Sequence, residues 1–193
     1  RDDLLRGVVE ESVAVSLGRF CAKIYNETSA KPKAYFSEML GDDDNGAMRA
    51  ITRDYVFTKP FQQDETNRKI DAETALGFRV ANARNDTGLL AAVAKARQAF
   101  DGAHDCLSHG DLHAGSVMVD GARTVCIDAE FACRGPAGLD IAFLIAGYVF
   151  AFCAADAHAA DAEAAGIRRV SCGDAVKALW RAYSDARSGE PKM

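Results

Sequence analysis

The sequence lacks an excess of positive charge. Its 193 residues include 23 Lys and Arg against 28 Asp and Glu, which gives a net charge of −5. Binding to a nucleic-acid backbone requires a concentrated basic surface, and no segment of the chain supplies one. We therefore expect no nucleic-acid partner.

The sequence also lacks the cysteine and histidine spacing of a disulfide framework or a zinc site. None of its six cysteines forms a CxxC pair,. His109 and His113 are four residues apart, but they lie on a glycine-containing loop, and the spacing suggests no third ligand,. With no secretory leader recognisable at its start, the chain is expected in a reducing, cytoplasmic setting.

No apolar run is long enough to cross a bilayer. The longest extends from Ile141 to Ala155, between Asp140 and Asp156, and falls short of the roughly 20 residues that a membrane-spanning helix needs,. This run predicts a buried helix. We expect no membrane partner.

Helical periodicity dominates what is present. Apolar side chains recur at helical spacing in several segments, and Asp86-Thr87 is expected to cap one of them,. The acidic run at residues 42–46 lacks the later ligands of an EF-hand loop, so it predicts a solvated turn. The predicted helices cover residues 2–28, 34–40, 47–54, 87–102 and 141–155.

One β-hairpin is predicted, with acidic residues at its base. Val117–Val119 and Val125–Ile127 are rich in β-branched residues, and Asp120-Gly121 lies between them,. Asp111 precedes the hairpin and Asp128 and Glu130 follow it, so the hairpin should bring these carboxylates to one cleft. In an extended chain Asp128 and Glu130 would point the same way.

These carboxylates suit phosphoryl transfer. One acidic residue on a tight loop can accept a proton from a substrate hydroxyl, and a second acidic pair can hold the Mg²⁺ that neutralises nucleotide phosphates. Taken singly, the acidic pair would more often be an ordinary polar strand end, and the two histidines would more often orient a loop or satisfy a core hydrogen bond than act in catalysis. Their combination favours a phosphotransferase.

Four motifs are similar to those of a known protein family. They are His109-Gly110-Asp111-Leu112-His113, Gly115-Ser116-Val117-Met118-Val119, Ile127-Asp128-Ala129-Glu130-Phe131 and Gly135-Pro136-Ala137-Gly138-Leu139-Asp140-Ile141. Together they resemble the methylthioribose kinase family, which belongs to the protein-kinase-like small-molecule phosphotransferases. In that wider group asparagine occupies the position of Ser116. Ser116 and the Asp-Ala-Glu metal segment both match the narrower family.

The resemblance is strongest over residues 105–150. Before residue 85 it is weaker: Thr58–Phe61 and Asn67-Arg68 resemble a family segment that usually has an acid at the position of Lys59. After residue 155 little matches. Arg168-Arg169 is an adjacent pair, but its surroundings differ from those of the paired arginines that the family uses near its sugar site.

The resemblance implies a role for each motif residue. Asp111 is the catalytic base, and Asp128 and Glu130 hold the metal. Ser116 either faces the metal or bonds to its own loop. The remaining implied roles are substrate binding for His113, Asn67 and Arg68, and structural support for His109, Gly110 and Asp140.

Two of these assignments carry a structural expectation. Asp140 would cap the first turn of its helix and tie down the catalytic loop. His113 would face the substrate or, as the alternative that we favour, bond to the loop backbone.

The resemblance also implies a fold class and a reaction. The expected fold is α+β and mostly helical: residues 1–193 form one C-terminal lobe of a protein-kinase-like fold, with a short β-hairpin at the catalytic loop. A glycine-rich loop and a phosphate-binding lysine would lie upstream. The cofactors would be Mg²⁺ and ATP, and the reaction would convert 5-methylthioribose to its 1-phosphate in methionine salvage, in a cytoplasmic homodimer.

Two alternatives remain open at this stage. One is a different kinase of the same architecture, of the aminoglycoside or choline type. Asparagine at position 116 and a metal segment with aspartate alone would have favoured it, but this chain has Ser116 and an Asp-Ala-Glu segment. The other is an inactive kinase lobe that acts only as a binding module.

Overall fold

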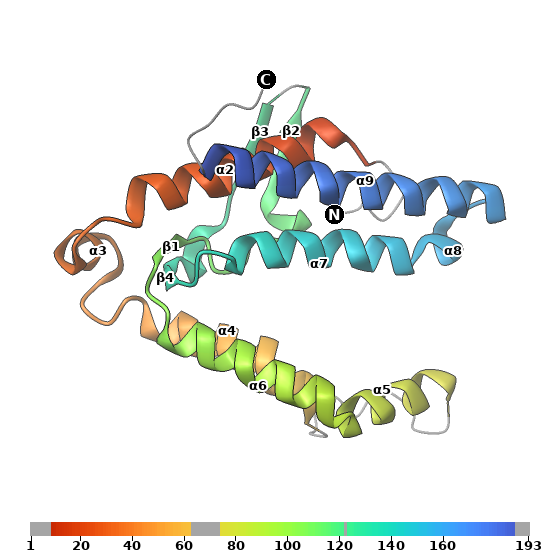
Figure 1. Ribbon diagram of the computed structural model, residues 1–193, viewed down its shortest axis with the longest axis horizontal. Coiled ribbons are helices and arrows are strands. Elements are labelled where there is room, and N and C mark those ends of the chain that lie inside the picture. The colour runs from red at the N-terminus through yellow and green to blue at the C-terminus, as the bar shows by residue number, and fades with distance from the viewer. Residues whose placement is uncertain (1–8, 63–73, 122, 188–193) are drawn as a thin grey trace.

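Helices make up most of the computed structural model, which describes residues 9–62, 74–121 and 123–187 (Figure 1). The helices are α2 (Glu11–Thr28), α3 (Lys33–Leu40), α4 (Gly46–Phe57), α5 (Ala75–Asn85), α6 (Thr87–Gly102), α7 (Leu139–Cys153), α8 (Ala155–His158) and α9 (Ala162–Arg187). Short 3₁₀ turns are η1 (Lys59–Phe61), η3 (Ala114–Ser116) and η4 (Ala129–Phe131).

The strands form two antiparallel pairs. Strand β1 (Cys106–Ser108) pairs with β4 (Cys133–Gly135), and β2 (Val117–Asp120) pairs with β3 (Arg123–Cys126). The β2–β3 pair is the hairpin predicted from the sequence. The predicted fold class, α+β and mostly helical with a short β-hairpin, is confirmed.

The core forms where α2, α7 and α9 pack together. Figure 1 shows α2 and α9 side by side, with α7 beneath them. Leu112, from the loop before the hairpin, is fully buried in this core and anchors the loop to it. The largest apolar side chains that the helices contribute are Leu17, Ile141, Leu144, Tyr148, Leu179 and Tyr183.

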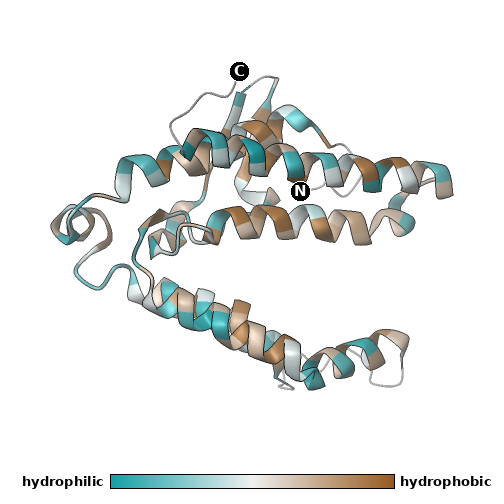
Figure 2. Cartoon of the chain, viewed as in Figure 1, coloured by the Kyte–Doolittle hydropathy of each residue, from teal (hydrophilic) through white to brown (hydrophobic). Residues whose placement is uncertain are grey.

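Helix α7 is buried on one face only. Figure 2 shows that it is apolar along most of its length. Its inner face contacts α2 and α9, but Val149 is 47% exposed and Phe150 70% exposed. The expectation of a buried helix was therefore wrong for its outer face, because both neighbours pack on the same side. No helix in the described ranges has both the length and the hydropathy to cross a membrane.

The other helix predictions were confirmed in part. Helices α3, α4 and α6 match the predicted segments, and the side chain of Asp86 caps α6 by accepting a hydrogen bond from the Leu89 N–H (2.9 Å). Helix α2 begins at Glu11, and residues 1–8 of the predicted helix lie outside the described residues. Helices α5 and α9 were not predicted from the sequence.

Helices α4 and α6 form an arm on the far side of α7 from α9 (Figure 1). Arg49 of α4 joins this arm to β4. Its buried guanidinium donates hydrogen bonds to the carbonyl oxygens of Phe100 and Arg134, and also to those of Asp101 (3.3 Å) and Ala103 (3.2 Å). Arg49 therefore holds α4 beside β4 and the C-terminal end of α6.

A close approach of α2 and α9 gives a first prediction. A Cβ atom on Gly18 would lie 2.4 Å from the carbonyl oxygen of Leu179. Gly18→Ala should force the helices apart and lower the free energy of unfolding by about 1–3 kcal/mol, measured by urea denaturation. The control is Gly173→Ala on α9, where an added Cβ meets no atom within 4 Å. Equal losses in the two variants would contradict the packing argument.

Candidate functional site

Asp140 holds the loop that carries Asp111. Its carboxylate accepts hydrogen bonds from the backbone N–H groups of His109 (2.7 Å) and Gly110 (3.1 Å), and it is buried. Burial raises the pKa of the Asp140 carboxyl above its usual value, and the two N–H donors oppose that rise. The residue lies in the first turn of α7, but the N-cap position is Gly138 and no side chain caps that helix. The expected capping role was therefore wrong, because both carboxylate oxygens bond to the loop.

Gly110 lets the loop touch the segment that carries Asp128 and Glu130. Its φ of +85° lies in the left-handed region that favours glycine,. A Cβ atom there would lie 2.1 Å from the carbonyl oxygen of Phe131 in η4. The two acidic motifs are therefore packed backbone against backbone.

The side chain of Asp111 projects from this loop and is 48% exposed. Its carboxylate lies 3.6 Å from Nε2 of His113. His113 Nδ1 accepts a hydrogen bond from the Gly115 N–H (2.8 Å), so in the neutral ring the hydrogen sits on Nε2, on the side of Asp111,. His113 thus makes the contact with the loop backbone that was favoured, and it also orients toward Asp111.

Ser116 and His109 close the base of the hairpin. The buried Ser116 hydroxyl donates to the carbonyl oxygen of Asp111 (3.0 Å), which is the loop contact weighed against a metal role. His109 Nε2 lies 2.9 Å from the carbonyl oxygen of Ile127 and must donate, because that oxygen only accepts,. The His109 contact runs between the loop and the chain that leads to Asp128, whereas the Ser116 contact lies within the loop.

Asp128 and Glu130 do not lie on an extended strand. Asp128 has a left-handed backbone (φ 67°, ψ 50°) and precedes the 3₁₀ turn η4, which contains Glu130. The expectation that alternation along a strand aligns their side chains was therefore wrong, because β3 ends at Cys126 and the chain then turns against Gly110. Both side chains are exposed.

Residues of the acidic run at 42–46 contact this site, although the run was expected to be a solvated turn. The side-chain amide of Asn45 donates hydrogen bonds to the carbonyl oxygens of Glu130 (2.8 Å) and Ala132 (3.0 Å). Asp44 is buried, with its carboxylate 3.5 Å from His104 Nδ1 and 3.9 Å from the Arg134 guanidinium. The expected solvated turn is thus wrong for these two residues, because they contact β4 and its neighbours.

The donor set suits a hard cation, although it is no dedicated metal cage. Within the described ranges, no three His, Cys, Asp or Glu side chains come close enough to hold a metal ion. Mg²⁺ usually takes only one or two protein carboxylates and fills the remaining positions with phosphates and water. The exposed carboxylates of Asp128 and Glu130 fit that pattern.

Other candidates lie elsewhere or outside the description. Asn67 and Arg68 fall among residues 63–73, outside the described residues. Arg169, on α9, pairs with Asp156 of α8.

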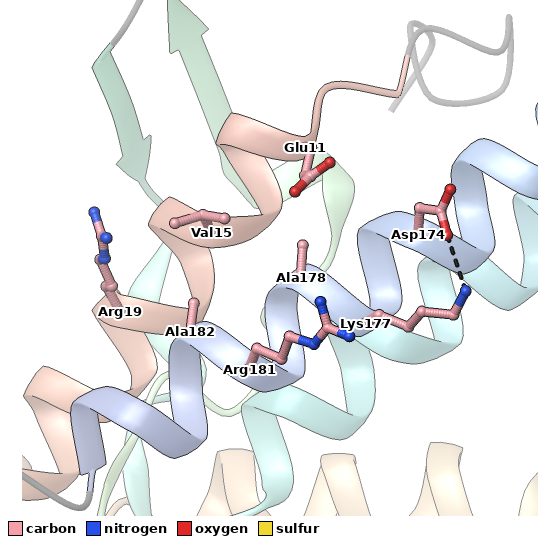
Figure 3. A pocket seen from close by; sticks show the side chains of 8 residues that line it. All are labelled: Glu11, Val15, Arg19, Asp174, Lys177, Ala178, Arg181 and Ala182. Atoms are coloured by element: carbon pink, nitrogen blue, oxygen red, sulfur yellow. Dashed lines mark hydrogen bonds and ion pairs between the residues drawn. The ribbon is translucent and has the colours of Figure 1, made fainter. Parts of the chain in front are cut away.

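A hollow of about 320 Å³ lies between α2 and α9 (Figure 3). None of the predicted site residues lines it. The lining side chains are Glu11, Val15, Arg19, Asp174, Lys177, Ala178, Arg181 and Ala182.

The contacts of Asp140 give a second prediction. Asp140→Ala leaves the amides of His109 and Gly110 without their acceptor, which should lower the local opening free energy by about 1–3 kcal/mol. Hydrogen exchange of these two amides should then be roughly 5- to 150-fold faster. Asp156→Ala removes a carboxylate that is 72% exposed and is the control. Unchanged exchange at both loop amides would contradict the assigned contact.

The chain is similar to known proteins over almost its whole length. The chain is 33% identical over 190 residues to a methylthioribose kinase of Pectobacterium atrosepticum, a match that covers 95% of this chain and 46% of the relative. A methylthioribose kinase of Cronobacter sakazakii is 32% identical over 188 residues, with 96% and 46% covered. The chain thus spans about half the length of the curated relatives it matches.

These matches confirm the resemblance that the motifs suggested. The family model described as "Phosphotransferase enzyme family" (APH) matches residues 10–182, which include every part of the loop, hairpin and turn described above. The chain therefore belongs to the phosphotransferase enzyme family.

Proposed function

We propose that the chain carries the catalytic loop and metal-binding turn of an ATP-dependent kinase that phosphorylates 5-methylthioribose at its anomeric hydroxyl. The observation that carries the proposal is the contact of Gly110 with Phe131, which packs the Asp111 loop against the turn of Asp128 and Glu130. The names of the relatives support the substrate.

Asp111 is the proposed catalytic base. Its half-exposed carboxylate can reach a bound substrate, while its own backbone carbonyl is held by Ser116. It accepts the proton of the sugar hydroxyl as the oxygen attacks the γ-phosphorus of ATP. The Nε2–H of His113 faces the same carboxylate and can orient it or contact the sugar.

Asp128 and Glu130 would hold the metal. Bound Mg²⁺ supplies positive charge beside the phosphates of ATP. The two carboxylates offer the oxygen ligands that this ion prefers, and their turn is held on one side by Gly110 and on the other by Asn45,. Ser116 stands where other kinases of the wider group have a metal-facing asparagine, and its hydroxyl donates to the loop.

Residues 1–193 form a single C-terminal lobe, and an N-terminal lobe supplies the glycine-rich loop and the phosphate-binding lysine. Asn67 and Arg68 contact the sugar. The full-length protein works as a cytoplasmic homodimer in methionine salvage.

A substrate screen tests the function. The full-length protein is incubated with Mg²⁺, ATP and, separately, methylthioribose, other pentoses and aminoglycosides, and ADP release is followed with a coupled assay. We expect the highest kcat/KM with methylthioribose and a 1-phosphate product identified by ³¹P NMR. Preference for an aminoglycoside would replace the substrate, and no turnover with any acceptor would favour the inactive binding module.

A further inference from the structure

Asn45 connects the start of α4 to the turn that carries Glu130. Its side-chain Nδ2 donates to the carbonyl oxygens of Glu130 and Ala132, at 2.8 and 3.0 Å, across more than 80 residues of sequence. One amide group thus uses both of its hydrogens on a single turn. The two accepting carbonyls flank Phe131, whose own carbonyl oxygen faces Gly110.

The conformation of Asn45 is suited to this contact. Asn45 occupies the N-cap position of α4 with a left-handed backbone (φ 58°, ψ 46°), which asparagine tolerates better than most residues,. An asparagine at an N-cap usually accepts a hydrogen bond from its own helix, but this side chain makes no cap bond,. The amide is directed to η4 instead.

Asn45 lies in a segment that several hydrogen bonds hold in place. Its N–H donates to the carbonyl oxygen of Leu40 (3.2 Å), and its own carbonyl oxygen accepts from the Arg49 N–H (3.0 Å). Arg49, one turn further along α4, is buried and bonds to four backbone carbonyl oxygens. An amide held in place in this way can fix the position of the carbonyl oxygens to which it donates.

We propose that Asn45 is a positioning residue that holds the turn of Asp128 and Glu130 in its metal-binding conformation. The proposal rests on the metal role given to these carboxylates under the proposed function. Gly110 contacts the Phe131 carbonyl and Asn45 bonds to the Glu130 carbonyl, so the backbone of this turn is restricted. The Cα atom of Glu130 is therefore fixed, which limits the positions that its carboxylate can take. Residues that orient metal ligands influence affinity without touching the ion.

Asn45→Gly tests the proposal in the full-length protein. Glycine keeps the left-handed backbone but removes the amide, so the helix start is preserved and only the contact with η4 is lost. Binding of Mn²⁺, used as a spectroscopic substitute for Mg²⁺, is measured from the free-ion electron paramagnetic resonance signal in the presence of ATP. We expect about tenfold weaker Mn²⁺ binding, with a parallel rise in the Mg²⁺ concentration for half-maximal activity.

Asn26→Ala is the matched control. The Asn26 amide also donates to a distant backbone carbonyl, that of Ala186 (2.9 Å), but it joins α2 to α9 away from the turn. Its loss should leave Mn²⁺ binding unchanged. Equal Mn²⁺ affinity in Asn45→Gly and the parent protein, or equal weakening in Asn45→Gly and Asn26→Ala, would overturn the proposal.

A second measurement reports on the turn without the metal. The Ala132 N–H bonds to the Ala129 carbonyl oxygen inside η4 (3.0 Å). Its hydrogen exchange should become faster in Asn45→Gly, and also in Asn45→Asp, whose carboxylate keeps the shape of asparagine but has no hydrogen to donate. Unchanged exchange at Ala132 in the variants that fold would overturn the positioning role.

The outcomes separate this proposal from the proposed function. Mn²⁺ binding that depends on Asn45, without turnover of methylthioribose, would refute the function and keep the positioning role. Turnover of methylthioribose with unchanged Mn²⁺ affinity in Asn45→Gly would keep the function and refute the positioning role. A parent protein that binds no Mn²⁺ even with ATP would refute the role of Asn45.

Discussion

Asp111→Asn is expected to lower the turnover number of the full-length protein by a factor on the order of 10² or more. Asparagine keeps the size of the side chain but cannot accept the proton of the sugar hydroxyl at neutral pH. The loop should be preserved, because its anchors are Leu112 in the core, Ser116 on the Asp111 carbonyl, and Asp140 on the preceding amides. Steady-state kinetics with saturating Mg²⁺ and ATP provide the measurement.

Two further measurements make this result specific. ATP binding, followed by calorimetry, should change little in Asp111→Asn, since the base acts on the sugar. Asp120→Asn alters an exposed carboxylate at the other end of the hairpin and should retain the parent turnover. A turnover number for Asp111→Asn equal to that of the parent would remove Asp111 from the mechanism.

Asp128→Ala and Glu130→Ala should each weaken Mg²⁺-dependent nucleotide binding by at least about tenfold, because even the outer partners of metal ligands typically contribute that much. Each substitution removes an anionic oxygen from a cation that prefers oxygen ligands. Both side chains are exposed in their turn, so the fold should survive their loss. ATP affinity is measured by calorimetry across a series of Mg²⁺ concentrations.

The control for the metal prediction is again the hairpin tip. Asp120→Ala removes one carboxylate from the same hairpin, so it accounts for the general change in charge. Its Mg²⁺ midpoint should match that of the parent protein. If the midpoint is equally unchanged in Asp128→Ala and Glu130→Ala, the two residues are only a polar turn after β3.

Local sequence signals were sufficient for several elements. The cap at Asp86 placed the start of α6, because an aspartate before a helical pattern satisfies an N–H of the first turn,. The two β-branched runs around Asp120-Gly121 placed the hairpin, since strand preference and turn chemistry agree there,. The motif from His109 to His113 identified the loop that carries Asp111.

Helices without a distinct apolar stripe were missed. Helix α9 buries mostly small residues, among them Ala175 and Ala178, and such residues give a weak periodic signal,. Its packing depends on the close approach at Gly18, a contact between segments more than 150 residues apart. Periodicity within one segment carries no information about such a contact.

The sequence by itself determined the residue types of the candidate site, the hairpin beside it and most helices, because capping, strand preference and short motifs act over a few neighbouring residues. Only the tertiary structure decided how these residues are held. In the structure, the Asp140 carboxylate bonds to the loop, Asp128 lies beyond the end of β3, and the Asn45 side chain bonds to the carbonyl oxygen of Glu130. The physical reason is that backbone hydrogen-bonding groups must find partners once they are removed from water, and the partners here come from segments distant in sequence.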